Sequence, residues 1–240
     1  MSNTLENSMI NPDKVKAIAL PGIHEHFYTL FKSYYPEGAG INVLDAGAGH
    51  GAFSKKLFED GFETKACDLF PELFYFDQIE CIKADVSKEL PYTSSLFDAV
   101  VSVEVMEHIH DHLAFFREAY RVLNDRGRLF VSTPNILSLK SRWQFFLSGF
   151  FYSFKPLEHS RTDGLQHLSS MTVDQYVNIG YASGFLKIKV HIDKKQNSSK
   201  VLLLFYPFLL LYCKWKKIPF HLHNSCSLLT GRILFIVFEK

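Results

Sequence analysis

The sequence lacks several features that would place it in a special class of proteins. Its four cysteines, at positions 67, 81, 213 and 226, include no Cys-x-x-Cys pair, which argues against a disulfide framework or a zinc ribbon and favours a reducing compartment. Twenty-six Lys and Arg stand against twenty-five Asp and Glu. No excess of one sign therefore indicates nucleic-acid binding or disorder.

A secretory signal and a long hydrophobic run are also absent. The N-terminal MSNTLENSMINPDK is polar where a signal would begin basic and turn apolar, so a cytoplasmic protein is expected. The longest apolar run, from Val201 to Cys213, contains Pro207. As a helix it would be about 20 Å long, against a hydrocarbon core of about 30 Å. We expect no simple transmembrane anchor, while contact with a membrane surface stays open.

Short apolar runs alternate with amphipathic stretches along the chain. Strands are predicted over residues 41–46, 62–67, 80–83, 97–103, 127–132, 185–192 and 232–238. Helices are predicted over residues 23–35, 52–59, 111–123 and 172–182. The helix over 111–123 is expected to bury the stripe Leu113, Phe116, Tyr120 and Leu123. This alternation predicts an α/β fold with a parallel sheet covered on both faces.

A glycine-rich segment, Val43 to Gly51, joins the first predicted strand to the helix after it. Glycines there let the backbone approach a ligand closely, which is typical of a cofactor loop. Gly47-x-Gly49-x-x-Ala52, with Asp68 further along, also satisfies the dinucleotide fingerprint. The glycine spacing alone does not choose between cofactors.

Carboxylates at strand ends favour a cationic ligand. Asp45 stands two residues before the first glycine and completes the pattern D-x-G-x-G-x-G, and a carboxylate there suits an ammonium group better than a pyrophosphate. Asp68 and Asp85 end the next two predicted strands. All three are expected at the carboxyl edge of the sheet, where open α/β folds bind ligands.

With these motifs in place, residues 41–133 resemble the class I S-adenosylmethionine-dependent methyltransferases. The resemblance implies a Rossmann-like, seven-stranded, mostly parallel sheet with a terminal antiparallel hairpin and helices on both faces. We expect a single domain over residues 1–240. Its parts are an N-terminal helical cap (1–40), a cofactor-binding core (41–135), an acceptor-side cap (136–170) and a basic apolar insert (194–230).

The resemblance also implies which residues bind S-adenosylmethionine. Asp45, Ala46, Gly47, Gly49 and Gly51 would hold its methionine part, Asp68 and Leu69 the ribose, and Asp85 and Val86 the adenine, with Glu104 at the edge of the site.

A possible catalytic group follows the fourth predicted strand. His108 ionises near neutrality and suits a general base for the methyl acceptor, with Glu107 beside it. Glu104-x-x-Glu107-His108 is similar to the E-x-x-E-H pattern of the ubiquinone-pathway O-methyltransferases and the small-RNA 3′-terminal methyltransferases. In the alternative, His108 only packs or forms a hydrogen bond near the cofactor.

In those two branches the pattern helps to bind a divalent ion. The resemblance implies a Mg²⁺ site at Glu104, Glu107 and His108, completed by a later histidine, for which His167 and His159 are the candidates. Elsewhere in this region, His110 and His112 are expected to be solvated.

Two apolar segments bear on the acceptor. The aromatic residues of the segment 136–152 either line an acceptor pocket or fill a helical cap: Trp143, Phe145, Phe146, Phe150, Phe151 and Tyr152. Residues 194–238 hold seven Lys or Arg and no Asp or Glu. Within them, the segment 194–217 is expected to contact an anionic membrane surface, to form a homodimer surface or to fold as a buried hairpin.

The sequence therefore predicts a methyltransferase that O-methylates a small-molecule, glycan or lipid-linked acceptor, with N-methylation left open. The alternatives are an NAD(P)-dependent oxidoreductase and a non-catalytic cofactor-binding scaffold. A nucleic-acid substrate is not expected, because the chain lacks a broad basic surface and an Asn-Pro-Pro-Tyr motif.

Overall fold

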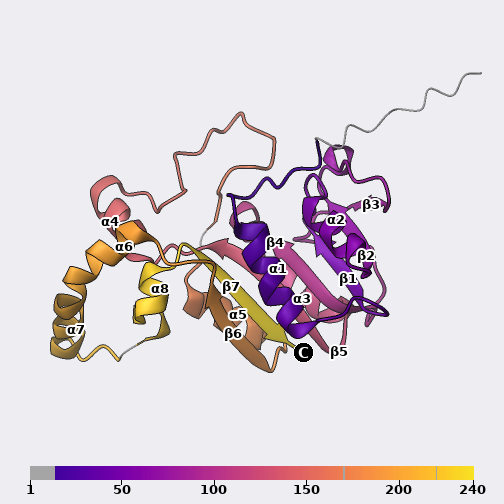
Figure 1. Cartoon of the computed structure of the whole chain (residues 1–240). Helices are drawn as coiled ribbons and strands as arrows, with labels where there is room; N and C mark the ends of the chain where they lie inside the picture. Colours follow the sequence, from indigo (N-terminus) through magenta and orange to yellow (C-terminus); the bar gives the residue numbers. More distant parts are fainter. Residues whose placement is uncertain (1–13, 170, 220) are drawn as a thin grey trace, which may run out of the picture.

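A computed structural model of the chain describes residues 14–169, 171–219 and 221–240. Residues 1–13 of the expected N-terminal cap lie outside this range. The described strands are β1 (Asn42–Ala46), β2 (Glu63–Asp68), β3 (Cys81–Lys83), β4 (Phe97–Val103), β5 (Leu123–Pro134), β6 (Lys187–Ile192) and β7 (Ile233–Glu239). They form one sheet in the order β3-β2-β1-β4-β5-β7-β6 (Figure 1).

The sheet has the predicted mixture of directions. Strands β1 to β5 pair in parallel, whereas β7 runs antiparallel between β5 and β6. Within this sheet, neighbouring residues of one strand face opposite layers: Val43 packs in one buried cluster and Leu44 in the other. Both faces are therefore covered, which confirms the predicted α/β fold.

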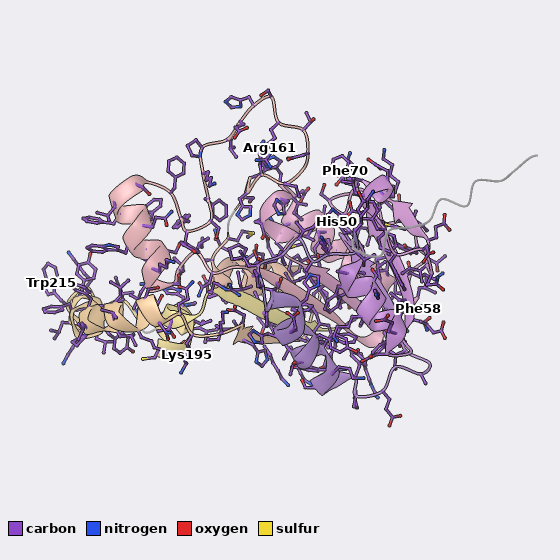
Figure 2. All side chains as sticks on the ribbon, turned by 45° about the horizontal axis from the view of Figure 1, so that its top comes forward. His50, Phe58, Phe70, Arg161, Lys195 and Trp215 are labelled. Atoms are coloured by element: carbon purple, nitrogen blue, oxygen red, sulfur yellow. The ribbon has the colours of Figure 1, made fainter. Side chains whose placement is uncertain are left out.

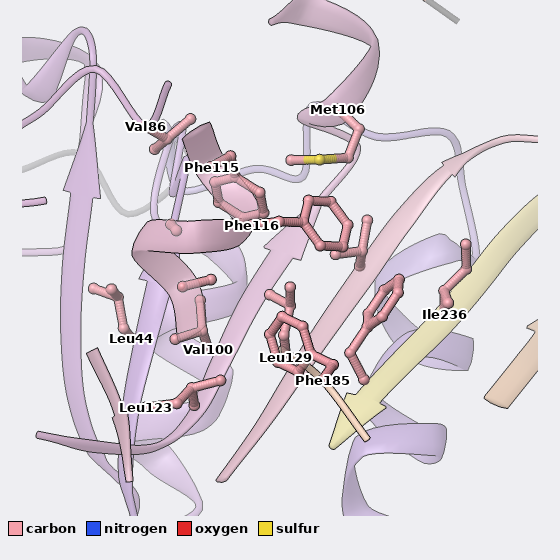
Figure 3. Packing of buried hydrophobic residues seen from close by; sticks show 14 of the residues in the cluster. Leu44, Val86, Val100, Met106, Phe115, Phe116, Leu123, Leu129, Phe185 and Ile236 are labelled. Atoms are coloured by element: carbon pink, nitrogen blue, oxygen red, sulfur yellow. The ribbon is translucent and has the colours of Figure 1, made fainter. Parts of the chain in front are cut away.

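Helices cover the two faces in pairs. The helices beside the sheet are α1 (Ile23–Tyr34), α2 (Ala52–Glu59), α3 (His112–Val122) and α5 (Val173–Ala182). Aromatic residues of α1 and α2 share one buried cluster with Phe130 of β5. Those of α3 and α5 share the other, in which Phe116 lies against Phe238 with ring centroids 4.9 Å apart. Figure 3 shows part of this cluster, with Phe115 and Phe116 labelled. Helix α5 begins with the predicted capping box between Thr172 and Gln175.

The buried stripe of α3 agrees with the expected one in part. Phe116 and Leu123 are buried as expected, whereas Leu113 and Tyr120 are only half-buried. Phe115, Ala119 and Val122 are buried in addition. His112 is buried rather than solvated, and its ring packs against Tyr176 of α5 at 5.7 Å. His110 is exposed, as expected.

The remaining helices lie to one side of the sheet (Figure 1). They are α4 (Leu139–Ser148), α6 (Asn197–Leu202), α7 (Tyr206–Trp215) and α8 (Cys226–Thr230), with 3₁₀ turns at η4 (Leu203–Phe205) and η5 (Leu222–Asn224). The 3₁₀ turns η2 (Pro71–Leu73) and η3 (Met106–His108) follow β2 and β4 instead. The insert is thus helical, and the expectation of a buried hairpin there is wrong. Among the described residues, no helix combines the length and apolarity needed to cross a bilayer.

Candidate active site

A cavity of 590 Å³ opens at the carboxyl ends of β1, β2 and β4. It is lined by most of the residues that the sequence assigns to the cofactor or to catalysis: Asp45, Gly47, Gly49, Asp68, Leu69, Asp85, Val86, Glu104, Glu107, His108 and His167. Of the other two, Ala46 is buried in β1 and Gly51 is the N-cap of α2. The topology thus places the ends of β1, β2 and β4, the segment after β3 and the glycine-rich loop around this cavity.

The glycine loop has a backbone that other residues would not adopt easily. Gly47 has a φ of 84°, and a Cβ there would lie 2.5 Å from Cγ2 of Val105. The backbone N–H of Gly49 donates to Oδ2 of Asp68 at 2.8 Å. The loop is therefore held open as a cradle beside β2.

Asp45 is a buried carboxyl that lacks a cationic partner among the described residues. Its Oδ2 accepts a hydrogen bond from Ser54 Oγ at 2.6 Å, and burial raises its pKa to about 7. A cationic ligand beside Asp45 would restore the charged form. The ammonium group of S-adenosylmethionine is a cation that could bind Asp45 in this way.

Asp68 and Asp85 keep acceptor capacity toward the same cavity. Oδ1 of Asp68 accepts the backbone N–H of Phe70 at 2.8 Å, so both of its oxygens are fixed by loop amides. Asp85 accepts from the hydroxyl of Ser87 at 2.6 Å, which is the main reason that its pKa is lowered. Each carboxylate oxygen can accept a further bond from a ribose hydroxyl or a base amine.

Two glutamates follow β4 at the floor of the cavity. Glu104 has a φ of 55°, unusual for a residue with a side chain, and its Oε1 accepts a hydrogen bond from Ser132 at 2.9 Å. Glu107 is buried beside Thr133, and burial raises its pKa. Its carbonyl also accepts the N–H of Leu168 at 2.8 Å. That bond ties the segment 149–169, here called the strap, to the turn η3 that carries Glu107 and His108.

His108 is oriented by the strap. Its Nδ1 lies 2.9 Å from the carbonyl oxygen of Gln166, so Nδ1 carries the proton and Nε2 is left as an acceptor. Burial lowers the pKa of His108, which keeps the ring neutral at pH 7. His167 packs edge-on against it at 5.0 Å, and burial lowers the pKa of His167 to about 4.

Three of the four predicted metal ligands come together. Glu107, His108 and His167 each offer a donor atom within 4.8 Å of the others, whereas Glu104 lies outside this group and His159 is exposed on the strap. Nδ1 of His167 is buried without a hydrogen-bond partner among the described residues. One carboxylate and two imidazoles fit Zn²⁺ or a similar transition metal better than Mg²⁺, which prefers oxygen ligands.

Two segments cover the cavity, and they lie in stretches for which the sequence predicts only caps, residues 1–40 and 136–170, without naming the residues that reach the cavity. Residues 16–20 run over the glycine loop, where a Cβ on Gly49 would lie 3.0 Å from Cδ1 of Ile18. From the other side Gly164 of the strap approaches the ring of Phe70, so that a Cβ on Gly164 would lie 2.8 Å from Cε2 of Phe70. The apolar Ile-Ala-Leu before α1 is the only sequence signal of the first cover. The six aromatic residues from Trp143 to Tyr152 do not line this cavity.

Comparison with known proteins identifies the family. Residues 24–190 match a family described as a methyltransferase domain. The chain belongs to the class I S-adenosylmethionine-dependent methyltransferase family. A methyltransferase domain thus covers the site and most of the sheet.

Relatives of known activity match this methyltransferase over part of its length. It is 34% identical over 106 residues to a ubiquinone biosynthesis O-methyltransferase from Xanthomonas oryzae pv. oryzae, a match of 40% of this chain and 44% of that protein. A homologue from Xanthomonas axonopodis pv. citri is 33% identical over 108 residues, which are 41% of this chain and 45% of that one. The chain therefore matches less than half the length of these curated relatives.

Solved structures share the fold of this methyltransferase. A SAM-dependent methyltransferase from Archaeoglobus fulgidus superposes with a TM-score of 0.60 and 18% identity over 90% of this chain and 94% of that one. The phosphoethanolamine N-methyltransferase 2 of Haemonchus contortus, in complex with S-adenosyl-L-methionine, superposes with a TM-score of 0.56 and 17% sequence identity. The match covers 90% of this chain and 52% of that one. The antiparallel β7 also distinguishes this sheet from the classic dinucleotide-binding order, which disfavours an NAD(P) oxidoreductase.

Proposed function

We propose that the protein transfers the methyl group of S-adenosylmethionine to an oxygen of a small-molecule, glycan or lipid-linked acceptor. One observation carries the proposal: the carboxyl cradle of Asp45 and Asp68 and the oriented ring of His108 line the same cavity. S-adenosylmethionine, when bound, supplies a methyl group already activated on a sulfonium. The chain then has to bind the cofactor, align the acceptor and remove its proton.

Three carboxylates would hold the cofactor. Asp45 would neutralise its ammonium group, Asp68 would accept bonds from its ribose hydroxyls, and Asp85 would face the adenine. The glycine cradle at Gly47 leaves room for the ligand beside the backbone. Residues 16–20 and the strap would exclude water from above.

His108 would act as the general base. Its Nε2 accepts the proton of an acceptor hydroxyl, because Nδ1–H is engaged with Gln166 and the ring is neutral at pH 7. The partial match to O-methyltransferases of ubiquinone biosynthesis supports oxygen as the atom methylated. Glu107 would orient the turn that carries His108.

A divalent cation is a second, separable part of the proposal. Glu107, His108 and His167 would hold it, and it would lower the pKa of an acceptor hydroxyl bound to it. With a metal bound, His108 would serve as a ligand and the hydroxyl would lose its proton to solvent.

Calorimetric titration with S-adenosylhomocysteine tests cofactor binding. We expect micromolar affinity in the wild type and a loss of at least about tenfold in Asp45→Asn, because the amide keeps the size of the side chain and removes its charge. Glu59→Gln, at the exposed end of α2, is the matched control and should bind as the wild type does. Folded protein that does not bind the ligand would refute the proposal.

The acceptor chemistry needs a second measurement. Release of S-adenosylhomocysteine from a panel of phenols, sugars and isoprenoid-linked glycans should identify a substrate, and His108→Gln should lower turnover without changing cofactor affinity. Titration of Zn²⁺, Mn²⁺ and Mg²⁺ into EDTA-treated wild type and His167→Ala would test the cation. Unchanged metal binding in His167→Ala would exclude the proposed ligand set.

A further inference from the structure

The helical insert carries an apolar stripe on its outer face. The stripe runs along α6, η4 and α7 with helical spacing, and its members are 54–75% exposed: Val201, Leu204, Phe205, Phe208, Leu211, Tyr212 and Trp215. The opposite face, with Tyr206 and Leu209, is apolar too and half-buried. A helix that is apolar all round is normally buried, yet α7 has no buried residue.

A second stripe on α4 continues this surface. Trp143, Phe146, Leu147 and Phe150 follow the same spacing and are 39–78% exposed. The ring of Trp143 stacks on Phe205 with centroids 6.3 Å apart, which joins the two stripes. We call residues 136–152 and 194–219 the α4–α7 lobe. An apolar surface of this continuity on a water-exposed lobe marks an interaction site.

The lobe is held in place by the rest of the chain. Arg142 of α4 donates from Nη2 to Oδ1 of Asn224, outside the lobe, at 3.0 Å. Helix α4 also packs against α8, which lies outside the lobe as well. Its apolar face is therefore presented as a fixed surface, with Trp215 at the far end from the sheet (Figure 2).

The charge around the stripes has one sign. The sequence of the lobe contains no Asp or Glu, while lysines stand at both ends of the apolar run, from Lys194 to Lys200 and from Lys214 to Lys217. Among the described residues, none of these lysines forms an ion pair. Apolar, Trp- and Tyr-bearing helices with a lysine rim are typical of membrane interfaces.

We propose that the α4–α7 lobe inserts its apolar face into the interface of a membrane that contains anionic lipids. A second copy of the chain fits less well, because two such lobes would bring lysine rims of the same sign together. A transmembrane arrangement fails on length: the ten residues of α7 span about 15 Å, half of the hydrocarbon core.

Membrane contact would also define the acceptor, a step that rests on the proposed function. The strap begins where α4 ends and supplies Ser153, Gly164 and His167 to the cavity wall. A docked lobe would therefore bring the cavity close to the lipid surface. The acceptor class favoured is a hydroxyl on a lipid-linked molecule that stays in the membrane.

The two tryptophans provide a direct readout. Trp143 and Trp215 are the only ones in the chain, and both lie in the lobe. We would titrate the full chain with vesicles of phosphatidylcholine alone and with about one third phosphatidylglycerol, following tryptophan emission and its quenching by brominated lipid. We expect a shift to shorter wavelength and at least about tenfold tighter binding to the anionic vesicles, weakened at high salt.

A double variant, Phe208→Asp with Leu211→Asp, should abolish vesicle binding and keep the affinity for S-adenosylhomocysteine. Leu186→Asp, equally exposed but before β6, is the matched control and should bind vesicles as the wild type does. Equal binding to both vesicle types, or unchanged emission with either, would overturn the proposal. So would a dimer in sedimentation velocity that is lost in the double variant, since a second copy would then cover the stripes. None of these readouts depends on methyl transfer.

Discussion

At the scale of single residues, the glycine loop is defined by steric limits that can be tested in pairs. Gly47 and Gly61 have nearly the same φ, 84° and 83°, but only Gly47 has a close neighbour, whereas the Cβ position of Gly61 has nothing within 4 Å. Gly61→Ala should cost about 1–2 kcal/mol of the free energy of unfolding and leave cofactor affinity intact.

Gly47→Ala should cost more than Gly61→Ala in stability and should also weaken S-adenosylhomocysteine binding by at least about tenfold, because Val105, which lines the cavity, would have to move. Urea unfolding and calorimetry would measure both effects. Equal effects of the two substitutions on affinity would show that the loop does not hold the cofactor.

The charge of Asp45 makes binding depend on pH. The pKa of this carboxyl is raised to about 7 by burial, while a bound ammonium group would favour the ionised form. Affinity for S-adenosylhomocysteine should therefore rise about tenfold from pH 6 to pH 8 in the wild type and stay flatter in Asp45→Asn. Calorimetry in buffers of different ionisation enthalpy would detect the released proton.

The raised pKa of Asp45 also makes stability depend on pH: the free energy of unfolding should fall as pH rises, whereas cofactor affinity should increase. Because the folded-state pKa of Asp45 lies above its unfolded value of 3.8, its contribution to the unfolding free energy is full below pH 3.8 and is lost as pH rises through about 7. The ligand-free wild type should thus lose more stability over this window than Asp45→Asn does. Parallel pH profiles of the two proteins would contradict the assigned burial effect.

At the scale of elements, local patterns predict the seven strands and the four helices beside the sheet, but not α4, α6, α7 and α8, and only part of the face that α3 buries. Helix α3 contains Phe115 and Phe116 side by side, so a helical period fits two stripes equally well. The place of α3 on the sheet buries Phe115 together with Phe116 and leaves Leu113 half-buried. That choice depends on tertiary packing and leaves no local signal.

Two substitutions in α3 test this assignment. Phe115→Ala should cost about 3–5 kcal/mol of the free energy of unfolding, since the side chain is fully buried, whereas the half-buried Leu113→Ala should cost less than half as much. Urea denaturation of both variants gives the comparison. The reverse order would restore the stripe expected from sequence.

In the candidate site, too, some residues could be predicted from the sequence, whereas others depend on tertiary packing. Acids at strand ends and the glycine loop could be predicted, because topology alone brings strand ends to one edge. Ser54, which donates to Asp45, and the strap carbonyl of Gln166, which fixes the ring of His108, depend on side-chain and loop packing far along the chain. The aromatic residues of α4 predict a pocket wall or the core of a cap, because apolarity in a sequence predicts burial without naming the partner.

At the scale of the whole molecule, the last strand completes the sheet. Within the described sheet, β7 pairs with β5 on one side and β6 on the other, and β6 joins the sheet only through β7. Residues of β7 also contribute to both buried clusters, so the C-terminal segment closes the two layers at once. The edge strand β6 is thus connected to the cofactor-binding strands of the described sheet through β7.

Removal of that strand should therefore unfold more than its own length. A chain ending at Arg232 should show no cooperative thermal transition and no S-adenosylhomocysteine binding, because β6 and α5 lose the surface on which they pack. A chain lacking only Lys240, whose Nζ donates to the carbonyls of Tyr120 and Leu123, should lose about 1 kcal/mol and still bind. Near-UV circular dichroism and calorimetry distinguish the two. A cooperative, ligand-binding protein without β7 would mean that the strands up to β5 fold on their own, and that the lobe is an appendage rather than part of one cooperative unit.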